Sequence, residues 1–179
     1  FTPSTQVAED GASFLAIELE ENGVAVCRVL LGERSASQVF FTTFSRQHLI
    51  LDVFSETLNQ FKPDVVHIQH LMGIPARLGA LIQNRQIPYV VTLHDYWYGC
   101  ANAQLLTNYD GKICDGPNRF FGNCGRCAVA RAGQSGTLNY LGVAAGPMMA
   151  YRQRLLRPVL AGAKAVIPPT RFVQSTYGQ

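Results

Sequence analysis

The apolar and polar positions along the chain predict short strands that alternate with helices. Apolar runs of strand length occur at residues 14–19, 24–31, 65–68, 88–93 and 164–167. Stretches with helical spacing or helix-start signals occur at residues 47–61, 74–85, 142–160 and 171–177. Because strands that are linked by helices tend to lie parallel in one sheet, this order predicts an α/β fold with a doubly wound, mainly parallel sheet.

Local signals refine several of these elements. Asn22-Gly23 between two apolar runs predicts a β-hairpin, although residues 14–21 are also compatible with a short helix. Pro75 suits the first turn of a helix, and Pro147 indicates either a helix start or a kink. Thr170 is a good N-cap for the last helix. The predicted apolar face of helix 47–61 consists of Leu51, Phe54, Leu58 and Phe61.

Composition and charge narrow the class of protein. Hydrophobic residues make up 47% of the 179 residues and charged residues 15%, which excludes a disordered chain and suits one domain. Residues 1–64 carry nine acids and four bases, a charge of −5, whereas residues 65–179 carry three acids and eleven bases, a charge of +8. The basic part suits either a phosphorylated or anionic-lipid partner or an ordinary solvated surface. Few basic and aromatic residues alternate, so nucleic acid is not an expected partner.

Histidines mark the ends of two predicted strands. His67 lies within the run at residues 65–68, His70 lies just beyond it, and His94 ends the apolar run at residues 88–93. Ligands of doubly wound sheets bind beyond the carboxyl ends of the strands, and imidazole both donates and accepts hydrogen bonds near neutral pH. We therefore expect His94 to face a ligand and His70 to lie near the same cleft, whereas His67 is expected to be a buried histidine bonded to the backbone.

Three sequence motifs, in order, resemble those of a known family. They are PDVVHIQHL at residues 63–71, IPYVVTLHDYW at residues 87–97 and AVIPPTRFV at residues 165–173. The N-terminal domains of family-4 glycosyltransferases carry PDVVHxH, IPxVxTxHD and AxxxxPSxF in this order. The resemblance covers residues 61–177, and the joint order of the motifs is far more specific than any single motif.

The resemblance implies a GT-B fold with two Rossmann-like domains that face each other across a cleft. Residues 1–179 are then the N-terminal, acceptor-side domain, and the C-terminal donor domain is expected to be absent from them. The family transfers a sugar from a nucleotide-sugar donor, here a UDP- or GDP-sugar, to a glycan or lipid-linked acceptor, usually with retention of configuration. We therefore expect a hexosyltransferase-type enzyme of glycan biosynthesis, inactive as this fragment.

The family motifs also assign roles to individual residues. The histidine of the TxH motif lines the cleft near the transferred sugar, and it matches His94, which is therefore the expected catalytic residue. The second histidine of the HxH motif is replaced here by Gln69, and His70 is displaced by one position. The first strand and the glycine-rich loop of such domains have no counterpart, and residues 1–3 resemble the end of the second strand.

Aromatic and acidic residues directly follow His94. Tyr96 and Trp97 are expected either to stack on a sugar or, for Trp97 in particular, to anchor the loop to the core. Asp95 is expected to contribute to substrate binding, as a partner of His94 or as a base, or else to cap the loop, since adjacent strand residues point to opposite faces.

Four of the five cysteines fall in a region of irregular sequence, residues 95–135, which we interpret as a cysteine-rich loop insertion. Their spacing, C-x13-C-x9-C-x2-C, is compatible with a structural zinc ion bound by Cys100, Cys114, Cys124 and Cys127. The insertion contains few core-forming residues, and a metal would supply folding free energy. Two disulfides or four free thiols are the alternatives. No leader segment is apparent, so a reducing compartment is expected and disulfides are disfavoured. Cys27, in an apolar run, is expected to be a buried hydrophobic residue.

Three arginines on the predicted helix 142–160, Arg152, Arg154 and Arg157, form a basic stripe beside leucines. Family members often act on lipid-linked acceptors, so the resemblance implies a cytoplasmic protein that makes peripheral contact with the inner face of the membrane. An ordinary surface helix is the alternative.

Two other functional classes compete with the transferase. A non-enzymatic, zinc-stabilised binding module could use the same fold, because fold alone does not determine function. An NAD-dependent oxidoreductase is disfavoured, since no G-x-G-x-x-G sequence follows a predicted strand.

Overall fold

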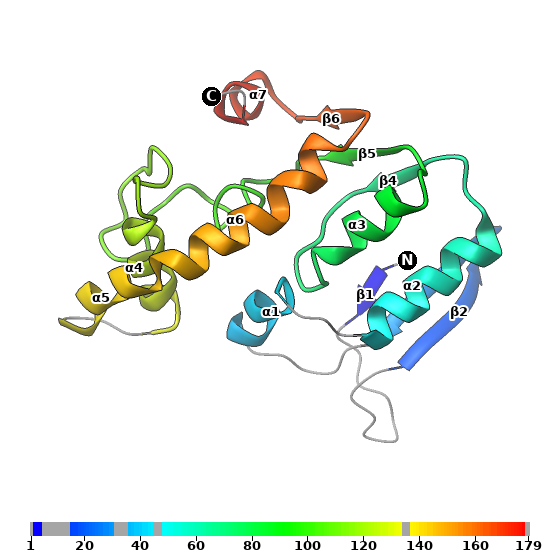
Figure 1. The fold of residues 1–179 in the computed structure, drawn as a ribbon, viewed down its shortest axis with the longest axis horizontal. Coiled ribbons are helices and arrows are strands. Elements are labelled where there is room, and N and C mark those ends of the chain that lie inside the picture. Colours follow the sequence, from blue (N-terminus) through cyan, green and yellow to red (C-terminus); the bar gives the residue numbers. More distant parts are fainter. Residues whose placement is uncertain (1, 5–14, 31–35, 45–47, 134–136, 178–179) are drawn as a thin grey trace. The chain divides into compact units, whose positions relative to one another are not determined.

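The helices and strands of the computed structural model (Figure 1) fall into two compact units. The structure describes residues 2–4, 15–30, 36–44, 48–133 and 137–177. The first unit comprises residues 1–64 and 71–87, and the second comprises residues 65–70 and 88–179.

Among its described residues, the first unit contains three helices and a mixed sheet that has three strands. The strands are β1 (Thr2–Ser4), β2 (Leu15–Glu21) and β3 (Val24–Leu30), in the order β1-β3-β2. Strands β2 and β3 are antiparallel, and β1 pairs with β3 in parallel. The helices are α1 (Ala36–Thr42), α2 (His48–Phe61) and α3 (Arg77–Asn84).

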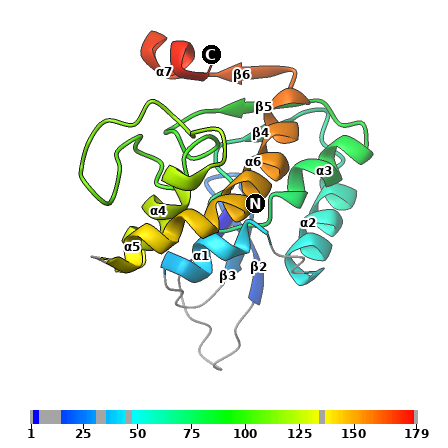
Figure 2. The ribbon, with the colours of Figure 1, turned by 60° about the vertical axis from the view of Figure 1, so that its left-hand side comes forward.

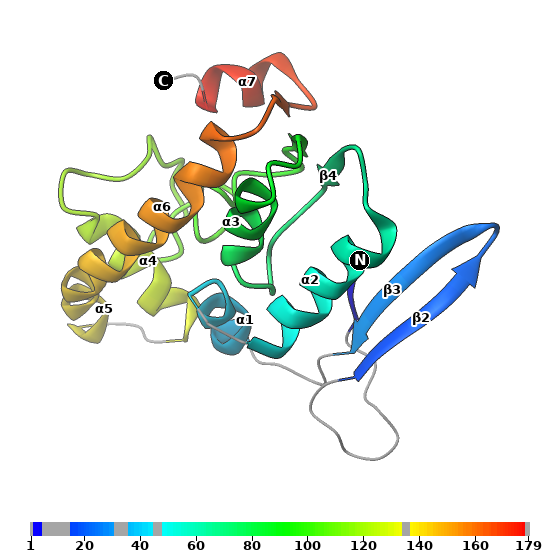
Figure 3. The ribbon, with the colours of Figure 1, turned by 45° about the vertical axis from the view of Figure 1, so that its right-hand side comes forward.

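The hairpin prediction is confirmed (Figure 3). Glu21 pairs with Val24, and the two residues between them, Asn22 and Gly23, have φ angles of 52° and 77°. Positive φ at both positions is what a type I′ turn requires, and asparagine and glycine tolerate it best. The alternative of a short helix at residues 14–21 is therefore wrong for residues 15–21, and Phe14 lies outside the described residues.

The helix predicted at residues 47–61 is α2, and Gln47 lies outside the described residues, but the buried face of the helix differs from the prediction. Ile50, Phe54 and Leu58 are buried, whereas Phe61, which was expected in the core, is 52% exposed. Phe61 is the last residue of the helix, and the chain turns directly after it at Lys62, whose φ is 43°. Pro75 was expected inside the first turn of the next helix, but α3 begins only at Arg77.

The second unit contains a parallel sheet and the remaining helices. Its strands are β4 (Val66–Ile68), β5 (Tyr89–Thr92) and β6 (Ala165–Ile167), in the order β4-β5-β6, and both pairings are parallel. The helical elements are α4 (Gly122–Arg131), α5 (Thr137–Leu141), the 3-10 turn η1 (Gly142–Ala145), α6 (Gly146–Ala161) and α7 (Arg171–Tyr177). The predicted α/β class is confirmed, but the parallel sheet has three described strands and its doubly wound character is not shown.

Helix α6 lies alongside α4 and follows η1 directly (Figure 2). Pro147 occupies its first turn, so this residue marks a helix start and not a kink. Tyr89 of β5 donates a hydrogen bond over 2.7 Å from its buried hydroxyl to the carbonyl of Val159 in α6. This bond fixes the helix against the sheet. Thr170 caps α7 as predicted, because its hydroxyl accepts the Val173 N–H over 3.2 Å.

The cysteine-rich region is more regular than the sequence indicates. Cys124 and Cys127 lie on the helix α4 and not on an irregular turn, which corrects the expectation for residues 95–135. Gly125 of α4 faces Gly142 and Gly146 so closely that an added Cβ on Gly125 would lie 2.2 Å from the Gly142 carbonyl oxygen. Glycine at these positions lets α4 pack directly against the backbone of η1 and the start of α6.

Candidate active site

The candidate site lies at the carboxyl ends of β4 and β5. Gln69 and His70 directly follow β4, and His94 and Asp95 follow β5 after one residue. Since β4 and β5 are paired in parallel, these four residues lie at the same edge of the sheet. This is the edge at which ligands of parallel α/β sheets bind.

A chain of hydrogen bonds connects the two strand ends. His94 Nε2 lies 2.7 Å from Gln69 Oε1. Gln69 Nε2 in turn lies 3.1 Å from His67 Nδ1 and 3.2 Å from His67 Nε2. His67 Nε2 also lies 2.8 Å from the Thr92 hydroxyl on β5. The expectation of a buried His67 bonded to the backbone is wrong, because the side chain is exposed and its described partners are side chains.

His70 and Asp95 form a second pair. His70 Nε2 lies 3.2 Å from Asp95 Oδ2, and Asp95 Oδ1 accepts the Trp97 N–H over 2.8 Å. The imidazole also contacts the Trp97 ring, with centroids 5.2 Å apart. Asp95 therefore caps the loop after β5, which was one of its two expected roles, and both of its carboxylate oxygens have protein partners.

Trp97 anchors this loop to the core. Its side chain is 3% exposed, and the guanidinium of Arg152 lies over the indole with Cζ 4.7 Å from the ring centroid. Arg152 Nη2 also donates to the Trp97 carbonyl oxygen. Arg152 is itself buried, so the predicted surface stripe of three arginines is wrong for this member, whereas Arg154 and Arg157 are exposed. Burial is the main cause that lowers the pKa of Arg152 to about 10.

Helix α7 also contacts the loop that follows β5, through its last residue, Tyr177. The Tyr177 hydroxyl donates to the Asp95 carbonyl oxygen over 3.2 Å. The Tyr177 ring stacks on Tyr96, with an interplanar angle of 14°. Burial raises the pKa of Tyr177 and of Tyr98, whose buried hydroxyl has no hydrogen-bond partner among the described residues. The loop is thus fixed by side chains far apart in the sequence.

The four loop cysteines lie near one another as free thiols. Cys127 Sγ accepts the Asn108 N–H over 3.3 Å, and Cys114 Sγ lies 4.0 Å from Asn123 Nδ2. The pKa of the Cys124 thiol is raised to about 12, first by burial and then by Cys114, Cys100 and Cys127. Nevertheless, no group of three or more histidine, cysteine, aspartate or glutamate side chains in the described part of the chain is arranged to hold a metal ion. The zinc prediction gains no support from this arrangement.

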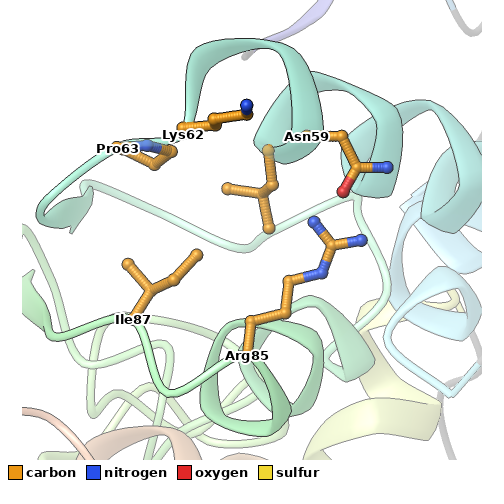
Figure 4. A pocket seen from close by; sticks show the side chains of 6 residues that line it. Asn59, Lys62, Pro63, Arg85 and Ile87 are labelled. Carbon is orange, nitrogen blue, oxygen red and sulfur yellow. The ribbon is translucent and has the colours of Figure 1, made fainter.

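A pocket of about 510 Å³ lies in the first unit, and its lining includes neither the strand-end histidines nor the four loop cysteines (Figure 4). It is lined by Leu58, Asn59, Lys62, Pro63, Arg85 and Ile87. The Arg85 guanidinium is engaged by Ser55, at 3.0 Å from its carbonyl oxygen and 2.6 Å from its hydroxyl. The lining segments precede β4 and β5 in the chain, whereas His70 and His94 follow these strands, so we do not assign the pocket to the candidate site.

Comparison with protein families shows the family to which the chain belongs. The family model of the glycosyl transferase 4-like domain matches residues 1–179, which is the entire sequence. The chain belongs to this family. The resemblance inferred from the three motifs is therefore confirmed, and the histidines at the strand ends belong to a glycosyl transferase 4-like domain. No curated protein and no solved structure matches the chain. Among the described helices of this domain, none is both long enough and apolar enough to cross a bilayer.

The structure brings together most of the predicted site residues of this domain. His70, His94, Asp95, Tyr96 and Trp97 all lie at the carboxyl ends of β4 and β5 or in the loop that follows. Sequence reasoning missed Gln69, Thr92, Arg152 and Tyr177. Gln69 is two residues from His67, and this spacing places both on one face of an extended chain, which was the available signal. Nothing in the local sequence separates Arg152 from its exposed neighbours.

Proposed function

We propose that this glycosyl transferase 4-like domain is the acceptor-side half of an enzyme that transfers a sugar from a nucleotide-sugar donor to a glycan or lipid-linked acceptor. The observation that carries the proposal is the position of His94. It is exposed, it lies at the carboxyl edge of a parallel sheet, and it matches the histidine of the family's TxH motif. An exposed imidazole at this edge is available to a ligand hydroxyl or phosphate.

In this proposal the residues around His94 have distinct roles. His94 contacts the transferred sugar, and the loop after β5 forms the adjoining wall of the site. Asp95 and His70 hold that loop through their mutual contact and through the Trp97 N–H. Tyr96, which is partly exposed, offers an aromatic ring beside the site. The donor is a UDP- or GDP-sugar bound mainly by a second domain, and transfer proceeds with retention.

A lipid-linked acceptor and peripheral contact with the cytoplasmic face of a membrane are also part of the proposal. Residues 116–179 contain eight arginine and lysine residues and no aspartate or glutamate. Phe120, Leu141 and Val143 are all more than half exposed. Their chain segments meet at η1, since an added Cβ on Gly122 would lie 3.0 Å from Val143 Cγ1 and one on Gly146 would lie 2.4 Å from the Phe120 carbonyl oxygen. We call Phe120, Leu141 and Val143, with the neighbouring Arg119, the η1 surface. Exposed apolar groups combined with basic ones suit an anionic membrane.

A non-enzymatic binding module stabilised by zinc is the second candidate. It is favoured by the grouping of four cysteines around α4, although these side chains are not arranged to hold a metal. Metal analysis of the purified full-length protein decides this point. One zinc ion per chain, whose removal unfolds the second unit, would support a structural zinc site, and such a protein without donor binding or turnover would be the binding module, whereas a metal-free folded protein would reject it.

The proposed enzyme is tested with the full-length protein and a panel of nucleotide sugars. Slow hydrolysis of one donor is expected to fall about tenfold or more in His94→Ala, which corresponds to about 1.4 kcal/mol of lost transition-state stabilisation. The matched control is His48→Ala, because His48 is an exposed histidine at the start of α2. An unchanged rate in His94→Ala would remove His94 from the site. Neither turnover nor binding of any donor in the folded protein would reject the transferase.

A further inference from the structure

The hydrogen-bond chain at the strand ends has a definite polarity. An amide oxygen can only accept a hydrogen bond, so with the Gln69 amide oriented as in the structure, its Oε1 2.7 Å from His94 Nε2, the proton lies on His94 Nε2. The amide nitrogen of Gln69 faces His67 on its other side, 3.1 Å from Nδ1 and 3.2 Å from Nε2. When His67 Nδ1 accepts a hydrogen bond from this nitrogen, its Nε2 carries a proton and donates to the Thr92 hydroxyl. All three bonds then run in one direction, from His94 to Thr92.

This polarity determines which nitrogen of His94 is available to a ligand. In the neutral ring with its proton on Nε2, Nδ1 carries a lone pair and acts as an acceptor. No described residue forms a hydrogen bond with Nδ1 of His94, and the side chain is exposed. A group that binds there must therefore be a hydrogen-bond donor, such as a hydroxyl, whereas an unprotonated phosphate oxygen has no proton to donate.

We propose that Gln69 is a positioning residue that holds neutral His94 with its proton on Nε2, so that Nδ1 accepts a hydrogen bond from a hydroxyl group of the bound sugar. The identity of this ligand rests on the proposed transferase function. The preference for one tautomer does not, because it follows from contacts within the protein. Gln69 occupies the position of the second histidine in the family's HxH motif, so an amide stands at this position in place of an imidazole.

The tautomer is measured directly by nitrogen NMR. The full-length protein is labelled with ¹⁵N-histidine at a pH at which the imidazoles are neutral, and the His94 signals are assigned by their loss in His94→Ala. We expect a protonated-type signal for Nε2 and an unprotonated-type signal for Nδ1. In Gln69→Leu, both tautomers should become populated. A proton on Nδ1 in the unmodified protein would overturn the proposal, because it would mean that the Gln69 amide presents its NH2 group to His94.

Activity provides the second readout. Gln69→Leu is expected to reduce kcat about tenfold while the donor KM changes less than about threefold, since the imidazole remains in place but loses its fixed proton. Gln69→Glu retains an oxygen acceptor but adds a charge that favours the protonated ring, so the acid limb of its pH–rate profile should move to higher pH. A structural defect would not produce this shift. Gln174→Leu, at an exposed glutamine on α7, is the matched control.

The two readouts separate failure of this proposal from failure of the proposed function. If the nitrogen signals agree with Nε2–H and change in Gln69→Leu, but the protein has no transferase activity, the positioning role holds and the transferase function fails. If His94-dependent turnover is found and Gln69→Leu leaves both the tautomer and the rate unchanged, the transferase function holds and the positioning role is rejected. Circular dichroism of each variant confirms that its fold is intact.

Discussion

Arg152 stacks on Trp97 in the interior of the second unit, with the guanidinium carbon 4.7 Å from the centroid of the indole ring. The same guanidinium donates to the Trp97 carbonyl oxygen, so one side chain holds both the ring and the backbone of the loop after His94. Arg152 is 2% exposed, and it forms no ion pair with a described carboxylate. Its positive charge therefore faces the indole ring and the Trp97 carbonyl oxygen, whereas its buried Nε has no hydrogen-bond partner among the described residues.

Removal of this arginine should destabilise the protein strongly. Arg152→Ala leaves a cavity beside Trp97 and removes the bond to its carbonyl, and we expect the free energy of unfolding to fall by about 2–3 kcal/mol. Arg154→Ala, on the exposed side of the same helix, should change it by less than about 0.5 kcal/mol. Chemical denaturation of the full-length protein, followed through the fluorescence of Trp97, measures the difference. Equal effects of the two substitutions would show that Arg152 contributes no more than a surface residue.

The contrast between these arginines illustrates what the sequence could predict in the helices. Helix α6 was predicted from its spacing and from Pro147, because such signals are local. That Arg152 faces the core and Arg154 the solvent depends on Trp97, which lies 55 residues away. Helix α4 was missed for a similar reason. Gly122 and Gly125 are poor helix formers, and the helix depends on close backbone contacts with η1 and α6 that are distant in sequence.

The close contact at Gly125 leads to a second prediction. An alanine Cβ at Gly125 would lie 2.2 Å from the Gly142 carbonyl oxygen and 2.9 Å from the Gly146 nitrogen, distances that no side chain can relieve. Gly125→Ala should therefore lower the free energy of unfolding by about 3 kcal/mol or more. Gly99→Ala is the control, since its added Cβ would meet only ordinary contacts at 3.8 Å and 3.9 Å. Thermal melting of both variants compares them, and a stable Gly125→Ala would contradict the tight packing of α4.

Alkaline pH should destabilise the protein through three acids, Tyr98, Tyr177 and Cys124, whose pKa values are raised mainly by burial. The folded state raises the pKa of Tyr98 and Tyr177 above the ordinary value of 10.0, and that of Cys124 from 9.0 to about 12, mainly through burial. The unfolded chain therefore loses these protons first as the pH rises. The contribution of the three protonated side chains to the free energy of unfolding is complete below pH 9 and declines above it.

The corresponding measurement is the free energy of unfolding between pH 7 and pH 11. Tyr177→Phe and Cys124→Ser should each make the decline above pH 9 shallower, because each removes one of the perturbed groups. Tyr140→Phe is a suitable control, since Tyr140 is 67% exposed. A decline that has the same slope in all variants would show that other groups cause it.

The candidate site was predicted unevenly from the sequence. His94 and His70 could be located because each lies at the end of an apolar run, and the linear sequence alone shows this position. The role of His67 was predicted wrongly, since its partners depend on the pairing of His67 with Val90, which brings Thr92 within reach. The link between Gln69 and His94 could not be predicted either, because it joins two strand ends that only the sheet register brings together.

The η1 surface should bind anionic membranes more strongly than neutral ones. Phe120 and Leu141 are 74% and 68% exposed, and burial of such side chains in a membrane is favourable by about 1.5–3 kcal/mol each. We expect the full-length protein to cosediment with vesicles that contain phosphatidylglycerol, and Phe120→Ser with Leu141→Ser to reduce its partition coefficient about tenfold or more. Phe61→Ser, at an exposed phenylalanine of the other unit, should leave binding unchanged.

Salt dependence distinguishes the two contributions to this binding. Charge attraction to Arg119 and the neighbouring bases weakens as salt is added, whereas burial of Phe120 and Leu141 does not. Binding in the unmodified protein should therefore decrease in high salt without disappearing, and binding of the double serine variant should disappear. Equal binding to neutral vesicles would contradict the role of the bases. Absence of any vesicle binding would mean that residues 116–179, which contain no aspartate or glutamate, form an ordinary basic surface. Membrane contact would then be removed from the proposed function.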